Sequence, residues 1–492
     1  MPIPRWVGVE IGVFLEAGGV NARIPSADVT SLGESEGIGV SAVGAEVLDR
    51  EDSVIPPEAH SRWNPLTRIA FRFSFLYFGL FCLLFTQIPF AFVGLLADSL
   101  PDSAVLWEFR TISPVVEWAG RLFFGTDVVL HEDSGSGDQR FIWSFVYCVL
   151  IVAVVATLIW TVLDRRRPNY QRLQAWFLLF IRMCLGGQML FYGFAKAIPT
   201  QMPEPALAKL LQPYGEFSPA SVLWNQVGSS PTYEILLGCA EVLGGLLLFV
   251  PRTATLGAML SLVSLAQVFV LNMTFDVPVK ILAFHLMLLS MVLLAPQARR
   301  LANVLVLDRP SEPTMQPDPF RGNRTRRIAI ALQVALGVWM AVGFVHTGLK
   351  YWNEGGGGSP KPPLYGIWTV SEFTQDGIPV PPLTTDETRW QRVVFDVPGM
   401  TYQKMDGTLV PAVPAVDTAA HTIAVSALPE QPDAQPTQIA AFSFEQPAPD
   451  RLTLNGQLNG RSVTISLRQV DLNGFPLRGR GFNWVQDYAY FH

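Results

Sequence analysis

Residues 175–197 read AWFLLFIRMCLGGQMLFYGFAKA, an apolar run interrupted by only a few polar side chains. About 20 residues of α-helix cross the hydrocarbon core of a bilayer, so this run is long enough for one crossing. An ionisable side chain inside a membrane helix is costly and usually has an assigned partner. The run therefore predicts a membrane-spanning helix in which Arg182 and Lys196 have a defined role.

Six further runs are apolar enough to cross a membrane. They lie at roughly 70–95, 141–163, 233–251, 254–274, 278–295 and 328–347. Half of the residues are hydrophobic and 15% are charged, whereas a soluble domain has about 25% charged residues. The net charge of −6 provides no general basic field for nucleic acid. We therefore predict a polytopic α-helical membrane protein of about seven spans, with the lipid bilayer and not nucleic acid as its partner.

The arginines gather in alternate loops, at 62–72, 165–172 and 299–327. Cytoplasmic loops carry an excess of Lys and Arg. One arrangement satisfies this rule: the N-terminus lies inside, the chain crosses seven times, and the C-terminus lies outside the cytoplasm.

Composition divides the chain into four parts. Residues 1–60, rich in Gly, Ser, Asp and Glu, are predicted to be poorly ordered, and 61–350 form the membrane domain. Residues 351–363 are a Gly/Pro-rich linker. In 364–492, runs such as 461–467 alternate polar and apolar side chains, which predicts an extracytoplasmic antiparallel β-barrel or sandwich.

The long loop at 97–140 has a helical pattern of its own. Aromatic residues recur at helical spacing between Leu106 and Phe124, with glutamates among them. This pattern predicts a helix that lies in the membrane interface and does not cross.

Polar and small residues share one helix face in two of the spans. They are Arg182, Met189, Gly193 and Lys196 in the third span, and Glu234, Gly238, Glu241 and Gly245 in the fourth. The pairs Gly193/Ala197 and Ala240/Gly244 permit close helix approach. We expect these faces to pack together, with Glu241 between Lys196 and Arg182 and each offset from it by about 10 Å along the axis.

More polar groups gather toward the predicted outer ends of the spans. They are Tyr192, Gln267, Asn272, Asp276, Lys280, His285, His346 and Lys350. This clustering predicts a hydrated pocket open to the outside, and the alternative is that these side chains reach to the interface from helix ends. The candidate intramembrane polar site consists of Arg182, Tyr192, Lys196, Glu241, Asn272, Asp276, Lys280 and His285.

His285 and His346 have similar predicted depths, which makes them candidate ligands of a haem iron or a metal. A hydrogen-bonded histidine beside a polar cavity is the alternative. The sequence has no HExxH motif or cysteine cluster, so no metal site is predicted. The four cysteines lie in separate runs without a CxxC pair and are interpreted as small buried hydrophobic residues.

Residues 175–295 resemble the DoxX-like membrane family. The resemblance rests on Arg182-Met183-Cys184-Leu185-Gly186, Gly193-Phe194-Ala195-Lys196 and Glu241-Val242-Leu243-Gly244-Gly245 before a basic turn at Arg252. It implies a four-helix membrane bundle in a bacterial cytoplasmic (inner) membrane. Family members are often labelled oxidoreductase-associated, after subunits of a thiosulfate–quinone oxidoreductase. The lack of paired cysteines in this bundle argues against direct thiol chemistry.

A second, shorter resemblance concerns the C-terminal domain. Gly366-Ile367-Trp368 resembles the Gly-x-Trp opening of lipocalin-like barrels, in which the tryptophan closes one end by packing.

The leading hypothesis is a DoxX-like inner-membrane protein with an outward-facing polar pocket for a small molecule or quinone, serving a membrane redox complex. At most it is an oxidoreductase-associated subunit. Lys196 would donate to an anion or a quinone oxygen, and Glu241 would carry a proton or act as counter-ion. Haem is disfavoured as the cofactor. The alternatives are a small-solute carrier, and a membrane scaffold or assembly protein that binds a partner through its β domain.

Overall fold

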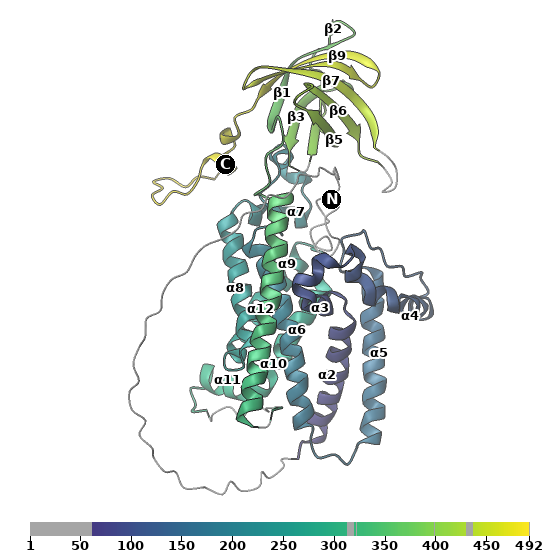
Figure 1. Cartoon of the computed structure of the whole chain (residues 1–492), viewed down its shortest axis with the longest axis vertical. Helices are drawn as coiled ribbons and strands as arrows, with labels where there is room; N and C mark the ends of the chain where they lie inside the picture. Colours follow the sequence, from purple (N-terminus) through teal and green to yellow (C-terminus); the bar gives the residue numbers. More distant parts are fainter. Residues whose placement is uncertain (1–61, 312–318, 321, 398, 430–435, 492) are drawn as a thin grey trace, which may run out of the picture.

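The computed structural model describes residues 62–311, 319–320, 322–397, 399–429 and 436–491. The segment 1–60, predicted to be poorly ordered, lies outside these residues. Within them, seven helices are long and apolar enough to cross a membrane. They are α2 (Pro65–Leu84), α5 (Arg140–Leu163), α6 (Gln171–Ala197), α8 (Pro231–Phe249), α9 (Ala254–Thr274), α10 (Lys280–Leu294) and α12 (Asn323–Glu354). They stand side by side beneath a β domain (Figure 1), as the sequence predicts. We call the end of the bundle that faces this domain the barrel side.

The first span ends earlier than its apolar run predicts. Helix α2 ends at Leu84, and the chain continues as α3 (Gln87–Phe90) and η1 (Ala91–Ser99) on the barrel side. Inside η1, Gly94 has a left-handed φ of 56°, which breaks a regular helix. A Cβ on Gly343 of α12 would lie 2.6 Å from the Gly94 carbonyl carbon. The prediction of a first span is confirmed, but its end at 95 is wrong, because the backbone becomes extended at Phe85 and α2 begins earlier, at Pro65.

The remaining helices are short or lie at the ends of the bundle. They are η2 (Asp102–Leu106), α4 (Trp107–Phe124), η3 (Leu207–Leu210), η4 (Tyr214–Glu216), α7 (Pro219–Gly228), η5 (Ala295–Gln297) and α11 (Ala298–Leu305). Helix α4 matches the helix predicted over 106–124 and extends sideways beside α5 (Figure 1). It exposes Trp107, Trp118 and Phe124. Its contact with the lipid interface stays a prediction.

The C-terminal domain is a closed antiparallel β-barrel of eight strands. These are β1 (Gly366–Gln375), β3 (Trp390–Asp396), β4 (Gly399–Lys404), β5 (Leu409–Asp417), β6 (Thr422–Ala427), β7 (Thr437–Ala448), β8 (Arg451–Leu458) and β9 (Arg461–Gln469), with the short β2 (Ile378–Pro379) on β1. Each strand pairs with the next, and β1 also pairs with β9 and closes the barrel. Closure leaves no long unpaired edge.

Apolar side chains from every barrel strand meet inside it, and Trp368 is among the most buried. Its indole N–H donates to the Leu364 carbonyl oxygen at 2.8 Å. The tryptophan of the Gly-x-Trp motif therefore has a packing role. The linker before the barrel is shorter than the predicted 351–363, because α12 continues through Glu354.

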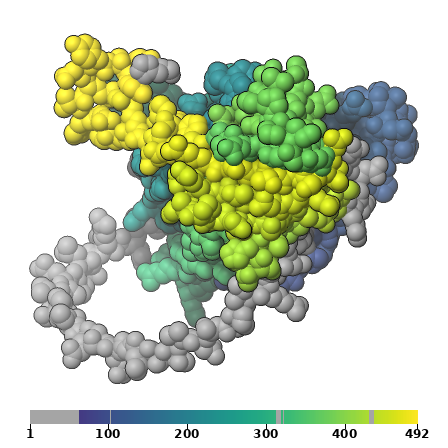
Figure 2. Space-filling view, turned by 90° about the horizontal axis from the view of Figure 1, so that it is seen from above, coloured from purple at the N-terminus to yellow at the C-terminus, as the bar shows by residue number. Residues whose placement is uncertain are grey.

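The barrel rests on the connection between α6 and α7. The Asp396 carboxylate accepts a hydrogen bond from the Leu207 backbone N–H at 2.7 Å. Leu207 is buried together with Ile367 and Val394 of the barrel. After β9 the chain forms η6 (Leu472–Gly474) and α13 (Pro476–Gly479). Figure 2 shows the barrel from above, with the C-terminal segment in yellow reaching out sideways.

Helices α6 and α8 approach each other closely through glycines. A Cβ on Gly238 would lie 2.3 Å from the Ala197 backbone nitrogen, and one on Gly193 would lie 2.7 Å from the Val242 nitrogen. The predicted packing of these two faces is confirmed. The pair Ala240/Gly244 does not contribute to it, because Gly244 faces α9, where its carbonyl oxygen approaches Gly257.

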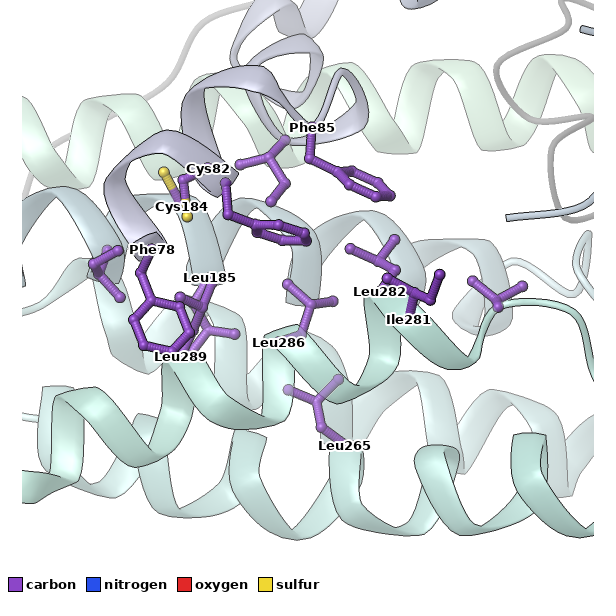
Figure 3. Packing of buried hydrophobic residues seen from close by; sticks show 14 of the residues in the cluster. Phe78, Cys82, Phe85, Cys184, Leu185, Leu265, Ile281, Leu282, Leu286 and Leu289 are labelled. Carbon is purple, nitrogen blue, oxygen red and sulfur yellow. The ribbon is translucent and has the colours of Figure 1, made fainter. Parts of the chain in front are cut away.

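The core around α2, α6 and α10 is almost wholly apolar. Figure 3 shows Phe78 and Cys82 of α2, and Phe85 directly after it, near Leu185 of α6 and the leucines of α10. The thiols of Cys82 and Cys184 lie within hydrogen-bonding reach of each other. Sequence spacing gives no sign of this pair, which the packing of α2 on α6 creates. Both residues are buried among hydrocarbon side chains and act there as small apolar residues.

The contact at Gly238 leads to a stability prediction. Gly238→Ala is expected to lower the thermal midpoint in detergent, because the added methyl group overlaps the α6 backbone and overpacking costs about 1–3 kcal/mol. Gly79→Ala on α2 is the matched control, since a Cβ there has nothing within 4 Å. Equal midpoints for the two variants would contradict the close approach.

Candidate functional site

The centre of the candidate site is an ion pair between α6 and α8. The Lys196 ammonium nitrogen lies 2.8 Å from Glu241 Oε2. The two side chains are only 6% and 8% exposed. Because neither charge has access to bulk water, each depends on the other for compensation. The sequence predicts only that Lys196 and Glu241 lie on facing helix surfaces, and the structure shows in addition that they pair directly.

The direction in which helical side chains lean explains how this contact closes. Side chains tilt toward the N-terminus of their own helix. Helices α6 and α8 are antiparallel, so Lys196 leans away from the barrel side while Glu241 leans toward it. The close contacts of Gly238 with Ala197 and of Gly193 with Val242 set Lys196 and Glu241 only about 3 Å apart along the helix axis. The expected offset of about 10 Å is therefore wrong for Lys196.

Arg182 has a different partner from the one predicted. It leans away from Glu241 for the same geometric reason, and its guanidinium donates to Gln333 Oε1 on α12. The Gln333 amide in turn donates to the Ala329 carbonyl oxygen at 2.9 Å. Of the two basic residues predicted to flank Glu241, only Lys196 contacts it, and Arg182 contacts Gln333 instead. Gln333 was missed because a lone glutamine on α12 has no pattern that points to α6.

Tyr192 connects the ion pair to the barrel-side end of the bundle. Its hydroxyl accepts a hydrogen bond from the Gln87 side-chain amide at 2.6 Å. The Lys196 ammonium lies 5.6 Å from the centre of the Tyr192 ring, within the range of a cation–π contact. Gln188 is also buried and donates to the Gln87 carbonyl oxygen at 3.1 Å. These contacts form a polar chain from Gln87 through Tyr192 to Lys196 and Glu241.

Two recesses adjoin Gln87 at the barrel-side end of this chain. One is lined mainly by apolar residues of η1, α6 and α12, including Phe191 and Phe344. The other, partly open to solvent, is lined mainly by the loop 130–139, together with Thr86, Phe109 of α4 and Leu282 of α10. Neither Lys196 nor Glu241 lines either recess. The ion pair therefore does not open onto either recess, and Gln87 and Tyr192 provide a described polar connection between them.

Glu234 is a further buried carboxyl group on the same face of α8. It is 0% exposed. Its Oε1 accepts from the Met202 backbone N–H at 2.9 Å, and its Oε2 has no hydrogen-bond partner among the described residues. The sequence places Glu234 on the same face as Glu241, but it gives no sign that a loop buries this carboxyl group. The loop that follows α6 covers it and keeps it from solvent.

Asn272, Asp276 and Lys280 hold the α9–α10 hairpin together. Lys280 lies 2.9 Å from Asp276, and the Asn272 amide donates to the Val279 carbonyl oxygen at 3.3 Å. The Asp138 carboxylate accepts from the backbone N–H groups of Lys280 and Ile281, both at 2.9 Å. Asp138 therefore caps the N-terminus of α10 from a distant loop. These contacts lie within the hairpin and with Asp138, away from Lys196, so the predicted place of these residues in the pocket of Lys196 is not supported.

His285 packs between α2 and α10. Its Nδ1 lies 2.7 Å from the Ile281 carbonyl oxygen, and its Nε2 lies 2.8 Å from the Tyr77 hydroxyl. A carbonyl oxygen only accepts, so Nδ1 carries the proton and Nε2 accepts from Tyr77. The ring also stacks on Phe81 at 4.1 Å between centroids. Ligation of haem or a metal by His285 would require loss of the Tyr77 hydrogen bond.

His346 lies in a separate cluster at the barrel-side end of α12. Its Nε2 is 3.0 Å from Asp98 of η1, and Lys350 is 3.7 Å from the same carboxylate. The side chain of His346 is 55% exposed. The two histidines that sequence depth grouped together therefore have different partners. Within the described ranges, no three His, Cys, Asp or Glu residues are grouped as a metal site.

The ion pair leads to a test by double substitution. Lys196→Met or Glu241→Leu alone is expected to destabilise the protein by about 3–5 kcal/mol, because each leaves one buried charge uncompensated. The double variant should lose much less than the sum of the two. Unfolding titrations in mixed micelles measure the three values. Additive losses would show that the two groups do not interact.

Comparison with known proteins shows neither the family nor the fold of this chain. No family model matches the chain. Among curated proteins, the chain is similar to the "Uncharacterized protein YwoB" of Bacillus subtilis (strain 168), with 28% identity over 132 residues. The matched region is 25% of this chain and 78% of the Bacillus protein. No solved structure matches. The resemblance to the DoxX-like family therefore stays a prediction based on the motifs of α6 and α8.

Proposed function

We propose that this protein is a DoxX-like protein of a bacterial inner membrane, with the barrel outside the cytoplasm, that binds a small amphipathic molecule, a quinone. The observation that carries the proposal is the buried Lys196–Glu241 pair and its polar connection to Gln87. Ionisable groups inside a membrane domain usually mark a binding or proton path. Gln87 lines both recesses, so a ligand there contacts the start of this path.

The chemistry of the recesses suits a quinone ring. Phe191 and Phe344 provide apolar surface near Gln87, and ligand pockets typically combine such surface with a few polar groups. The Gln87 amide donates a hydrogen bond, now to Tyr192, and a quinone carbonyl accepts one. In this proposal Lys196 stabilises negative charge that develops on a reduced ligand, and Glu241 is its counter-ion. Assembly with a membrane redox complex follows from the family resemblance alone.

Quinone binding by purified protein in nanodiscs tests the proposal. Titration with a short-chain quinone should quench intrinsic tryptophan fluorescence with saturation. Gln87→Leu should weaken binding about tenfold, because loss of one buried hydrogen bond and its polar partner costs about 1–3 kcal/mol. Tyr192→Phe, which removes only the hydroxyl group, should produce a smaller loss.

The matched control is Gln226→Leu on α7, where the native residue is exposed. It should bind as the wild type does. Wild-type protein that shows no saturable quenching would overturn the proposed ligand. Equal affinity of the Gln87→Leu variant and the wild type would overturn the proposed place of binding.

A further inference from the structure

The C-terminal segment 480–491 exposes an unusual density of large apolar side chains. Phe482, Trp484, Val485, Tyr488 and Phe491 are between 81% and 91% exposed. Single exposed apolar residues are ordinary, but a contiguous group of this size marks an interaction surface. The only described ring contact among these five joins Phe482 to Trp484, at 5.3 Å between centroids.

The root of the segment is fixed where the barrel meets the membrane domain. Val470, Leu472 and Phe475 pack against the buried cluster that Leu207 forms with Ile367 and Val394. Leu207 belongs to the connection between α6 and α7, at the barrel-side end of the bundle. The segment therefore begins close to the level at which the spans leave the membrane, and it does not extend from the far end of the barrel.

The direction of the segment also points to the bilayer. In Figure 1 it turns back from the barrel toward the helices. Seen from above, it projects sideways beyond the barrel (Figure 2). In both views it leaves on the side opposite α4, the other aromatic helix at this end of the bundle. A lateral projection at this level brings the aromatic side chains over lipid.

The chemistry of the segment matches a membrane interface. Tryptophan and tyrosine concentrate at the level of the lipid headgroups. There the apolar part of the ring contacts acyl chains while the N–H or O–H group remains hydrated. Arg478 and Arg480 precede the aromatic residues and Asp487 is the one acidic residue within 478–491. The Arg480 guanidinium lies 3.9 Å from the centre of the Tyr490 ring. A short basic and aromatic segment of this kind favours anionic headgroups.

We propose that residues 480–491 insert into the headgroup region of the bilayer and anchor the barrel to the membrane surface at a second point, besides its contact with Leu207. The partner is lipid, with a preference for anionic headgroups. Together with α4 on the opposite flank, the segment limits tilting of the barrel about its seat on the bundle. This inference does not depend on the proposed quinone ligand.

Site-specific fluorescence in nanodiscs tests the anchor with the full chain. A Val485→Cys variant is labelled with an environment-sensitive dye after Cys148 and Cys239 are replaced by Ser, because the other two cysteines are buried. Ser462→Cys is the matched control, since Ser462 is exposed beside the β8–β9 turn at the far end of the barrel. Lipids that carry a headgroup-level quencher should quench the dye at 485 about threefold more than at 462.

Two further arms make the result specific. Trp484→Ala with Tyr488→Ala and Phe491→Ala should reduce quenching at 485 to the level at 462, and these exposed positions leave the fold intact. Replacing anionic lipid by zwitterionic lipid should reduce quenching at 485. Equal quenching at 485 and 462 in the parent protein would show that the segment stays in water or needs a protein partner, and would overturn the proposal.

Discussion

The close approach of α6 and α8 is the constraint on which the polar site depends. Gly193 and Gly238 allow the two backbones to touch, and this contact brings Lys196 and Glu241 to 2.8 Å and keeps lipid and water away from them. Bulkier residues at these positions would separate the helices and leave two charges in an apolar medium. The desolvation cost of the two charges is therefore offset only while the helices pack closely enough for Lys196 and Glu241 to pair.

The sequence is sufficient to predict where the spans lie and which of their faces carry the polar residues. Length and hydropathy locate seven helices, and period arithmetic places Lys196, Gly193 and Glu241 on facing surfaces. The same arithmetic leaves the partner of Glu241 open between Lys196 and Arg182, because it treats residues as points on an axis. The register of the two helices decides the matter, because Ala197 meets Gly238 and Gly193 meets Val242, which leaves Arg182 much further along the axis from Glu241 than Lys196 is.

Other parts of the site are beyond sequence reasoning because they depend on long-range contacts. Gln333 meets Arg182 from a span much later in the chain. Asp138 caps α10 from a loop that has no helical pattern. A polar residue near a helix end can cap a helix, stabilise a hairpin or line a binding site, and the residue type alone does not distinguish these three roles. For this reason the sequence groups Asp276 and Lys280 with Lys196, although Lys280 pairs with Asp276 and Asp138 instead.

The connection between α6 and η3 joins the polar site to the barrel. Glu234 of α8 accepts a hydrogen bond from the Met202 backbone N–H, and Asp396 of the barrel accepts one from the Leu207 backbone N–H. Two carboxyl groups from different domains thus hold nearby points of one short segment, which begins directly after the helix that carries Lys196. The barrel and the α8 face that carries Glu241 are therefore linked by backbone hydrogen bonds to the same segment, without any direct contact between Lys196 and a described strand.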